Sequence, residues 1–399
     1  MTPHRCTALI GGAVSALLIA SLSYAQAPPA APGPAAGRGR GSAPPPLVSP
    51  DVHADHRVTF RLRAPEAREV TIGGEFITQA NAIQPPAGDL GVGPTPTIPM
   101  VKGADGVWTG TTTDPIRSGA YRYFFVVDGV TTLDSRNTIM SPQRLSQNSM
   151  LVVPGDYSET RNVPHGSVMQ QWYTSSTYGG VQRPIWVYTP PGYDRGQGTY
   201  PVLYLLHGAN DHENSWLTTG RANDILDNLI AEGQARPMLL VMPQHLAGPV
   251  GVSATVPGGF VHEFETDIVP WVQRTFRAVD AGGSRAIAGL SMGGQQTITV
   301  SMSRPDMFKY VGVFSIGQAD NTRETFYADK LPNLSTINGW NVHWWAWGHV
   351  DFLQPDAVKT VDYLKSKGVK FTTTRETAGG HDWRVWRDYL HEFVPLLFK

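Results

Sequence analysis

Residues 285–293 read RAIAGLSMG, so an apolar run leads directly into the pentapeptide G-L-S-M-G. The run predicts a buried strand over 286–290, and a helix is expected over about 293–303 because Pro305 follows. A serine on a tight turn between strand and helix is held in a strained backbone that crowds the residues two positions away, where glycine fits best. The stretch therefore predicts a nucleophile elbow at Ser291.

The segment from about 165 to 399 alternates between strand-like and helix-like stretches. PVLYLLHG and PMLLVMPQ are continuous apolar runs, which are typical of strands covered on both faces. Between them, ANDILDNLIAEG places its apolar residues on one helical face and closes at Gly233. The alternation indicates βαβ units and a mostly parallel sheet. With the elbow in its middle, it predicts an α/β-hydrolase domain over 165–399.

A serine is a weak nucleophile at its ordinary pKa, so it needs a base, and the base needs an acid to orient it. In this fold the acid and then the histidine follow the serine along the chain. Downstream of Ser291, His381 follows two glycines in a loop after the last predicted strand, where an imidazole can reach the serine. His349 is the rival because it also lies in a loop, whereas His343 falls in a predicted strand and His391 in a predicted helix.

The orienting acid is expected in the loop after the strand NVHWWAWG. Asp351 follows this strand by three positions and is the predicted acid. Asp356 opens the next helix, where a carboxylate in the first turn is an ordinary finding. Asp320 and Glu324 follow an earlier strand, which is the wrong place for the usual triad.

The tetrahedral intermediate of acyl transfer needs hydrogen-bond donors aimed at its oxyanion. The backbone N–H of Met292, directly after the nucleophile, is the first expected donor. The second should come from the loop after an early strand, where the sequence LHGA ends at Ala209. Gly208 would allow the backbone to approach closely, so the N–H of Ala209 is the predicted second donor.

Trp216, Trp383 and His207 are candidate substrate contacts. Trp216 lies near the oxyanion loop and Trp383 follows His381 by two positions, so either ring could contact an acyl group or a sugar. Packing in the core is the equally weighted alternative for both. For His207, the motif works through its backbone, which favours a packed or hydrogen-bonded side chain behind the loop.

The composition argues against several classes of partner. Lys and Arg total 32 and Asp and Glu total 33, and this balance disfavours nucleic acid or an anionic membrane as the main partner. The sequence contains no H-E-x-x-H or H-x-x-x-H helix, no phosphate loop and no dinucleotide fingerprint. We therefore expect neither a metal nor a cofactor.

The N-terminus has the features of a secretory signal peptide over 1–25, with a positive charge at Arg5, a short apolar stretch and a small-x-small cleavage site. The only cysteine, Cys6, would leave with it, so no disulfide is expected. Residues 26–50 are rich in Pro, Ala and Gly and predict a disordered linker. The sequence thus predicts an exported protein, secreted or periplasmic, and leaves its oligomeric state open.

Residues 51–155 show short alternating segments separated by turns, including one at Asp128-Gly129, which predicts an all-β immunoglobulin-like sandwich. VTFRLRAPEAREVTIGGEF, GVWTG and GAYRYFFVVDGVTTLDSRN resemble the early-set domain that precedes the catalytic domain of isoamylase-like enzymes. Glycogen-binding members carry exposed tryptophans and a lysine. The stretches that correspond to their binding face, Glu75 to Asn81 and Val130 to Leu133, contain no Trp, and Phe124 falls near the lysine position. We therefore expect a structural or substrate-positioning role for this domain.

Five further stretches carry a second resemblance: YTPPGY, YPVLYLLHGANDHENSW, GRANDILDNLIAEGQARPMLLVMP, AGLSMGGQQT and AGGHDWRVWRDYL. They resemble the esterase-D and feruloyl-esterase family of carbohydrate esterases, which also includes enterochelin esterases and a mycolyltransferase-like branch. The resemblance covers roughly 165–399. It implies Ser291 as nucleophile, Asp351 as orienting acid and His381 as base, in agreement with the assignment from the residues themselves.

The resemblance further implies a serine carboxylesterase that hydrolyses feruloyl esters on plant-wall polysaccharide such as arabinoxylan, through an acyl-enzyme. Its partner would be a small-molecule or polysaccharide ester, with no nucleic acid and no membrane after signal cleavage. Three enzyme alternatives share the same elbow and triad: a siderophore-type enterochelin esterase, an acetyl-xylan esterase and an acyltransferase. A glycan-binding protein that works through its β-sandwich is the alternative without catalysis.

Overall fold

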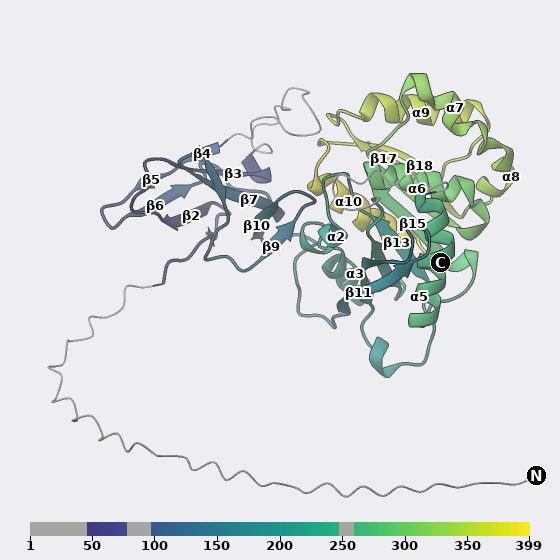
Figure 1. Cartoon of the computed structure of the whole chain (residues 1–399), viewed down its shortest axis with the longest axis horizontal. Coiled ribbons are helices and arrows are strands. Elements are labelled where there is room, and N and C mark those ends of the chain that lie inside the picture. Colours follow the sequence, from purple (N-terminus) through teal and green to yellow (C-terminus); the bar gives the residue numbers. More distant parts are fainter. Residues whose placement is uncertain (1–45, 78–96, 247–258) are drawn as a thin grey trace, which may run out of the picture. The chain divides into compact units, whose positions relative to one another are not determined.

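The computed structural model describes residues 46–77, 97–246 and 259–399 (Figure 1), and all but residue 46 of these belong to one unit, residues 47–399. The predicted signal peptide and most of the predicted linker lie outside the described residues. A β-rich region comes first along the chain, and a mixed α/β region follows. The fold class expected from the sequence is therefore confirmed.

The β-rich region contains two antiparallel sheets. One has the strand order β1-β2-β6-β5, and the other has the order β4-β3-β7-β10-β9 with β8 paired to β7. Their bounds are β1 Asp51–Val52, β2 Val58–Arg63, β3 Val70–Gly74, β4 Thr97–Pro99, β5 Val101–Lys102, β6 Val107–Thr111, β7 Gly119–Val127, β8 Val130–Thr132, β9 Met140–Pro142 and β10 Gln147–Val153.

One hydrophobic core joins these two sheets, because alternate residues of β2, β3, β7 and β10 point inward. Phe60 of one sheet packs on Tyr123 of the other, with ring centroids 5.0 Å apart. Trp108 is buried in the same core. The turn at Asp128-Gly129 joins β7 to β8, and both residues have positive φ (46° and 85°), as a tight two-residue hairpin turn requires.

The α/β region is built on one eight-stranded sheet with the order β11-β12-β14-β13-β15-β16-β17-β18. The pairs β11–β12 and β12–β14 are antiparallel, and all later pairs are parallel. The bounds are β11 Ser167–Ser175, β12 Val181–Thr189, β13 Val202–Leu206, β14 Leu239–Pro243, β15 Arg285–Leu290, β16 Tyr310–Phe314, β17 Val342–Gly348 and β18 Thr373–Thr377.

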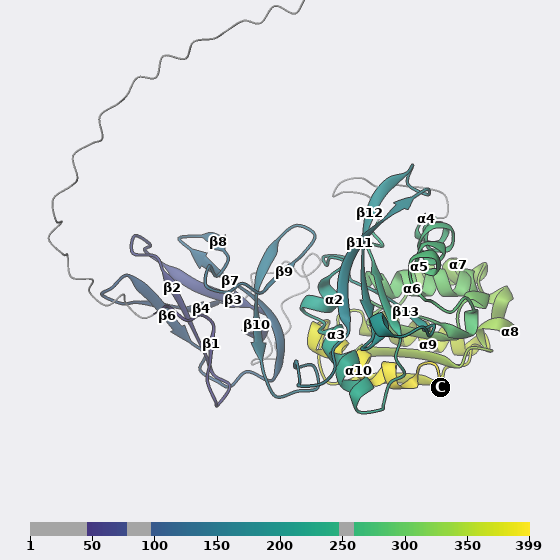
Figure 2. The same ribbon diagram turned by 90° about the horizontal axis from the view of Figure 1, so that it is seen from below.

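Helices cover both faces of this sheet (Figures 1 and 2). The helices are α2 Ser215–Thr218, α3 Ala222–Ala231, α4 Gly259–Glu263, α5 Val269–Thr275, α6 Met292–Ser303, α7 Asp320–Ala328, α8 Leu334–Ile337, α9 Gln354–Ser366 and α10 Trp383–Phe393. Apolar residues of α5, α6 and α9 share one core with the sheet, and those of α3 and α10 share the other. No helix of the described residues is long and apolar enough to span a bilayer.

The strand order determines where loops can meet. β13 and β15 are adjacent and parallel in the middle of the sheet, and β16, β17 and β18 follow on one side. All five strands therefore end at the same edge. In open parallel sheets, ligands bind at this carboxyl edge.

Candidate active site

The predicted elbow lies at the carboxyl end of β15, where Ser291 is the residue between strand and helix α6. Its backbone has φ 51° and ψ −119°, a conformation that is strained for any residue with a Cβ. A Cβ on Gly289 would clash with the backbone of Gly293, and a Cβ on Gly293 would clash with the carbonyl oxygen of His207. The spacing of glycines around Ser291 thus follows from the close contact between β13, β15 and α6.

His381 and Asp351 form a hydrogen-bonded pair in the loops after β18 and β17. The Nδ1 atom of His381 lies 3.0 Å from both carboxylate oxygens of Asp351. The carboxylate is fully buried and also accepts the backbone N–H of Leu353 at 2.8 Å, whereas the imidazole keeps 16% of its surface exposed. An acid fixed in this way holds Nδ1 protonated and leaves Nε2 free to accept a proton.

Ser291, Asp351 and His381 all follow strands that end at the same edge of the sheet. Within the described ranges, no hydrogen bond joins Ser291 Oγ to His381.

An indirect series of contacts runs from His381 to Ser291 through Trp386. The ring centroids of Trp386 and His381 are 5.0 Å apart, and Trp386 Nε1 donates to Ser315 Oγ at 3.0 Å. Ser315 follows Phe314, and the Phe314 carbonyl accepts the backbone N–H of Ser291 at 2.9 Å. Catalytic hydrogen bonds are often long before substrate binds, so this geometry is compatible with a serine–histidine pair.

The rival base, His349, has a different partner. Its Nδ1 lies 2.7 Å from Glu376 Oε1 on β18, and its side chain is 71% exposed. Hydrogen bonds from His349, Gln354 and Trp347 hold the pKa of Glu376 below its usual value. His349 is therefore hydrogen-bonded to Glu376 at the surface, and within the described ranges no hydrogen bond or ion pair joins it to Asp351.

The other two histidines downstream of Ser291 have structural contacts. His343 is buried in β17, where it accepts from the Trp345 indole at 3.0 Å and donates to the Lys370 carbonyl at 3.1 Å. Burial lowers the pKa of His343 to about 4. His391 lies in α10 and stacks on Tyr157, with ring centroids 4.1 Å apart.

The rival acids are also accounted for by their surroundings. Asp356 lies in the first turn of α9. Asp320 begins α7 and forms ion pairs with Lys359 at 2.7 Å and Arg323 at 2.8 Å, and these hydrogen bonds lower its pKa. Glu324 is exposed on the same helix. None of these three carboxylates contacts a histidine downstream of Ser291 among the described residues.

The loop after β13 lies beside the serine. A Cβ on Gly208 would be 3.8 Å from the Cβ of Ser291, so the backbone of this loop passes close to the nucleophile. The Gly208 carbonyl accepts two hydrogen bonds, from His207 Nδ1 at 2.8 Å and from the Asp211 N–H at 3.2 Å. This carbonyl belongs to the same planar peptide as the Ala209 N–H, so the two bonds hold the orientation of the expected second oxyanion donor.

The first expected donor is the backbone N–H of Met292, and Met292 is the first residue of α6. The first N–H groups of a helix have no partner within the helix, and the helix dipole is positive at this end. A negatively charged oxygen above Ser291 would therefore be stabilised here. Met292 and Ala209 follow the adjacent ends of the parallel strands β15 and β13.

Trp216, Trp383 and His207 are buried, with exposed fractions of 0%, 4% and 1%, and this burial favours the packing alternative over substrate contact for all three side chains. Trp216 donates from Nε1 to the carbonyl of Leu206 at 3.0 Å and packs edge-on against Trp383 at 5.1 Å. All three side chains support the loops from behind. Nearness along the sequence to a catalytic residue does not tell which way a side chain points.

Three exposed apolar side chains lie near the catalytic residues, and none of them was predicted from the sequence to contact substrate. They are Phe352, Met292 and Val350, with exposed fractions of 50%, 39% and 43%. The ring of Phe352 lies 4.5 Å from that of His381. The available signal was the lone aromatic residue directly after the predicted acid, Asp351.

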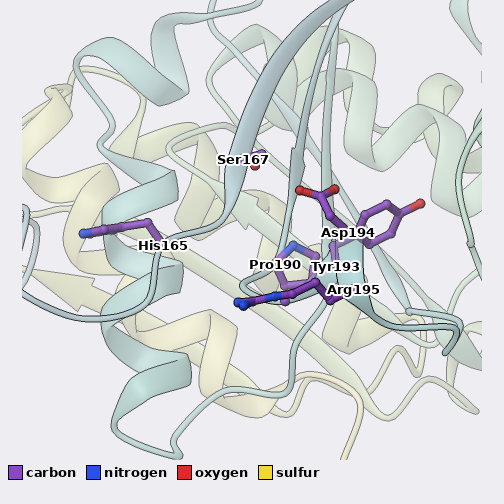
Figure 3. A pocket seen from close by; sticks show the side chains of 7 residues that line it. His165, Ser167, Pro190, Tyr193, Asp194 and Arg195 are labelled. Carbon is purple, nitrogen blue, oxygen red and sulfur yellow. The ribbon is translucent and has the colours of Figure 1, made fainter.

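A pocket of about 280 Å³ lies elsewhere in the molecule (Figure 3). It is lined by His165, Ser167, Pro190, Gly192, Tyr193, Asp194 and Arg195. These residues flank the end of β12, which runs antiparallel to β14, so they lie at the sheet edge opposite to Ser291. Within the described ranges, no group of three or more His, Cys, Asp or Glu side chains is arranged to hold a metal ion.

The sequence and the fold are similar to those of known esterases. Residues 176–368 match the family described as putative esterase. An endo-1,4-beta-xylanase/feruloyl esterase of Xylanibacter ruminicola is 30% identical over 363 residues, which is 88% of this chain and 46% of that protein. An endo-1,4-beta-xylanase Y of Acetivibrio thermocellus is 25% identical over 56% of this chain and 23% of its own length. The chain therefore spans less than half of both relatives.

Two solved structures show how far the likeness extends. A ferulic acid esterase is 26% identical and covers 58% of this chain and 97% of its own, with a TM-score of 0.50. The enterobactin esterase of Shigella flexneri is 17% identical and covers 85% of this chain and 92% of its own, with a TM-score of 0.56, which is a likeness in fold alone. The chain is therefore similar to this esterase family over residues 176–368, and this region has the α/β-hydrolase fold.

Proposed function

We propose that this chain is an exported serine carboxylesterase that removes feruloyl, or hydroxycinnamoyl, groups from plant cell-wall polysaccharide such as arabinoxylan. The observation that carries the proposal is the buried carboxylate of Asp351, 3.0 Å through both oxygens from His381 Nδ1, at the same sheet edge as the strained Ser291. The relative from Xylanibacter ruminicola, named as a xylanase and feruloyl esterase, supports the substrate class.

The proposed reaction has two halves. Ser291 Oγ attacks the ester carbonyl carbon while His381 Nε2 takes the hydroxyl proton, and Asp351 stabilises the imidazolium that forms. The N–H groups of Met292 and Ala209 stabilise the oxyanion. As the tetrahedral intermediate collapses, the bond between the acyl carbon and the sugar oxygen breaks, and His381 protonates the departing alcohol. Water, deprotonated by His381, then attacks the acyl carbon; as the carboxylic acid leaves, His381 returns the proton to Ser291 Oγ.

The side chain of Phe352 supports an aromatic acyl group. It is half exposed and lies against the ring of His381, so a flat acyl group attached to Ser291 could pack on it. Met292 and Val350 add exposed apolar surface in the same loops. A small acyl group such as acetate would gain little from these contacts.

Hydrolysis of a siderophore-type aromatic ester is the second candidate. It is favoured by the likeness in fold to an enterobactin esterase, which extends over 85% of this chain and so includes part of the β-rich region. Both candidates use the same elbow and the same acid–histidine pair, and in both the released acid carries an aromatic ring. They differ in the acyl group and in the alcohol that the site must accommodate.

A substrate panel with matched variants tests the proposal. We expect turnover of methyl ferulate and feruloylated arabinoxylan to exceed that of acetylated xylan, p-nitrophenyl acetate and enterobactin. Ser291→Ala and His381→Ala should each lower kcat by about 10⁴-fold or more with an unchanged fold. His349→Ala is the control for the histidine and should keep kcat within about twofold. Near-normal turnover by Ser291→Ala would refute the serine mechanism, and preference for enterobactin would favour the second candidate.

Export is a separate part of the proposal and rests on the sequence of residues 1–25. Expression of the full chain in a bacterial host should yield a protein outside the cytoplasm whose first residue is Gln26. Mass measurement of the mature protein checks this. A chain that keeps Met1 and stays in the cytoplasm would contradict it.

A further inference from the structure

Arg122 lies in β7 of the sandwich, but its guanidinium group contacts the α/β domain. Nη2 forms a 2.9 Å ion pair with Asp211 Oδ1 and also donates to Ser215 Oγ at 3.1 Å. The side chains of Arg122 and Asp211 are 5% and 8% exposed. A charged pair buried to this degree is held far more strongly than a surface pair, because either charge alone would be left without solvent.

Other groups fix the guanidinium from the sandwich side and from α10. Nε donates to Ser141 Oγ of β9 at 3.0 Å, and Nη1 lies 3.7 Å from Glu75 Oε1. The guanidinium carbon is 5.6 Å from the centre of the Trp383 ring, which follows the predicted base by two positions. Arg122 therefore offers Asp211 a partner whose position is set by several independent contacts.

Asp211 in turn holds the loop that carries the expected oxyanion donor. Its backbone N–H donates to the Gly208 carbonyl at 3.2 Å. Its carboxylate Oδ2 lies 3.0 Å from the point that a Cβ on Gly208 would occupy, so the two residues are in close contact. Because the Gly208 carbonyl and the Ala209 N–H share one planar peptide, a shift of Asp211 would turn the Ala209 N–H as well.

We propose that Arg122 is a positioning residue for the oxyanion hole: by holding Asp211, the sandwich fixes the direction of the Ala209 N–H beside Ser291. The inference rests on the proposed esterase function, in which this N–H stabilises the tetrahedral intermediate. It assigns the sandwich a role in the chemical step itself, apart from any binding of glycan. Arg122 would touch neither substrate nor the reacting atoms.

The test replaces Arg122 with methionine in the full-length chain and measures kcat and KM with methyl ferulate. A misplacement of about 1 Å in a catalytic group costs up to about 100-fold in rate, so we expect kcat to fall by about 10- to 100-fold. KM should change by less than about threefold, because the ground-state carbonyl depends little on the oxyanion donors. The inhibition constant of phenylboronic acid should rise in parallel with the loss of kcat, because its tetrahedral adduct with the serine uses the same donors.

Arg387→Met is the matched control. Arg387 is also a buried arginine between the two regions, at 1% exposed, and its Nη1 donates to the carbonyls of Ala120 and Thr219 at 2.9 Å. It has no contact with Asp211 among the described residues. Arg387→Met should lower the melting temperature, as Arg122→Met does, and should leave kcat and the boronate constant within about threefold of wild type.

Asp211→Asn provides a second measurement if Arg122→Met does not fold. It keeps the length of the side chain, removes the charge that Arg122 holds, and should lower kcat and weaken boronate binding by about three- to tenfold. Equal losses of kcat in Arg122→Met and Arg387→Met would overturn the proposal. A change in Arg122→Met that is confined to KM would overturn it as well. So would an Asp211→Asn chain that keeps the kcat and the boronate affinity of the wild type. A wild-type chain without ester turnover would instead refute the proposed function, so the two failures are distinct.

Discussion

Gly348 and Gly379 pack backbone to backbone, so closely that a Cβ on Gly348 would clash with the carbonyl oxygen of Gly379. Gly348 ends β17 and Gly379 follows β18, so each glycine begins one of the loops that carry Asp351 and His381. Backbone hydrogen bonds join the same loops, from the Val350 N–H to the Gly379 carbonyl at 3.0 Å. The distance between acid and histidine is therefore set by two residues without side chains.

Gly348→Ala should separate the two loops, because the obstacle is backbone and not the end of a flexible side chain. We expect kcat with methyl ferulate to fall by about 10- to 100-fold through loss of the alignment between Asp351 and His381. Gly198→Ala is the control, since a Cβ there meets no atom within 4 Å. Steady-state kinetics on both variants check the prediction, and a Gly348→Ala chain with wild-type kcat would contradict it.

Phe352→Ala should change the preference among acyl groups. Loss of an aromatic contact of about 0.5–1.5 kcal/mol together with its apolar area predicts about a tenfold fall in kcat/KM for methyl ferulate. Turnover of p-nitrophenyl acetate should stay within about threefold. Phe352→Tyr keeps the ring and should retain the preference. Equal losses for ferulate and acetate in Phe352→Ala would show that the ring acts on His381 and not on the acyl group.

Trp216→Phe should lower stability without changing KM. The substitution leaves the buried carbonyl of Leu206 without the indole N–H, which costs about 1–3 kcal/mol of the free energy of unfolding. Urea unfolding measures this loss. Trp172→Phe is the control because Trp172 is 55% exposed, and its effect should stay within about 0.5 kcal/mol. A Trp216→Phe chain with full stability and a raised KM would restore the substrate-contact interpretation.

His343 should make stability depend on pH between about 4 and 6.5. Burial lowers its folded pKa to about 4, whereas the unfolded side chain titrates near its usual value of about 6.5. Within this window the unfolded state binds the proton and the folded state does not, so the free energy of unfolding falls by about 1.4 kcal/mol per unit as pH decreases. The contribution is fully present above about pH 6.5 and is lost by about pH 4, a change of about 3 kcal/mol.

His343→Gln removes this titration. Urea unfolding of wild type and variant across the window should therefore show a shallower pH dependence for the variant, whatever its absolute stability. Other buried histidines, His207 and His245, also have pKa values lowered by burial, and they contribute equally to both chains. Identical pH slopes in the two proteins would contradict the prediction.

The sequence predicted the features that depend on local pattern and chain order. The elbow could be recognised because the glycines beside Ser291 are needed at fixed spacing, and Asp351 and His381 because the fold orders its loops along the chain. The directions of side chains could not be predicted in this way. Trp216 and Phe352 are both aromatic residues near catalytic positions, but one is fully buried and the other half exposed. That difference depends on packing between α2, α10 and the sheet.

Contacts between distant segments were equally hidden from the sequence. Arg122 precedes Asp211 by nearly ninety positions and lies in a strand whose pattern indicates only a half-buried β-sheet. Because the sandwich lacks tryptophans at the positions of a glycan-binding face, the sequence suggested a structural or positioning role for it. The buried pair of Arg122 and Asp211 is the place where the sandwich would exert that role.

The ion pair between Arg122 and Asp211 also limits how this protein can be dissected. Deleting the sandwich would remove the cation that holds the Asp211 carboxylate, in the loop that carries the Gly208 carbonyl. If a truncated chain then shows weak activity on polysaccharide, the cause would be the damaged catalytic loop. It would be wrong to conclude that the deletion had removed a carbohydrate-binding module. Grafting the esterase domain onto another scaffold calls for Asp211→Asn or a replacement cation from the new partner.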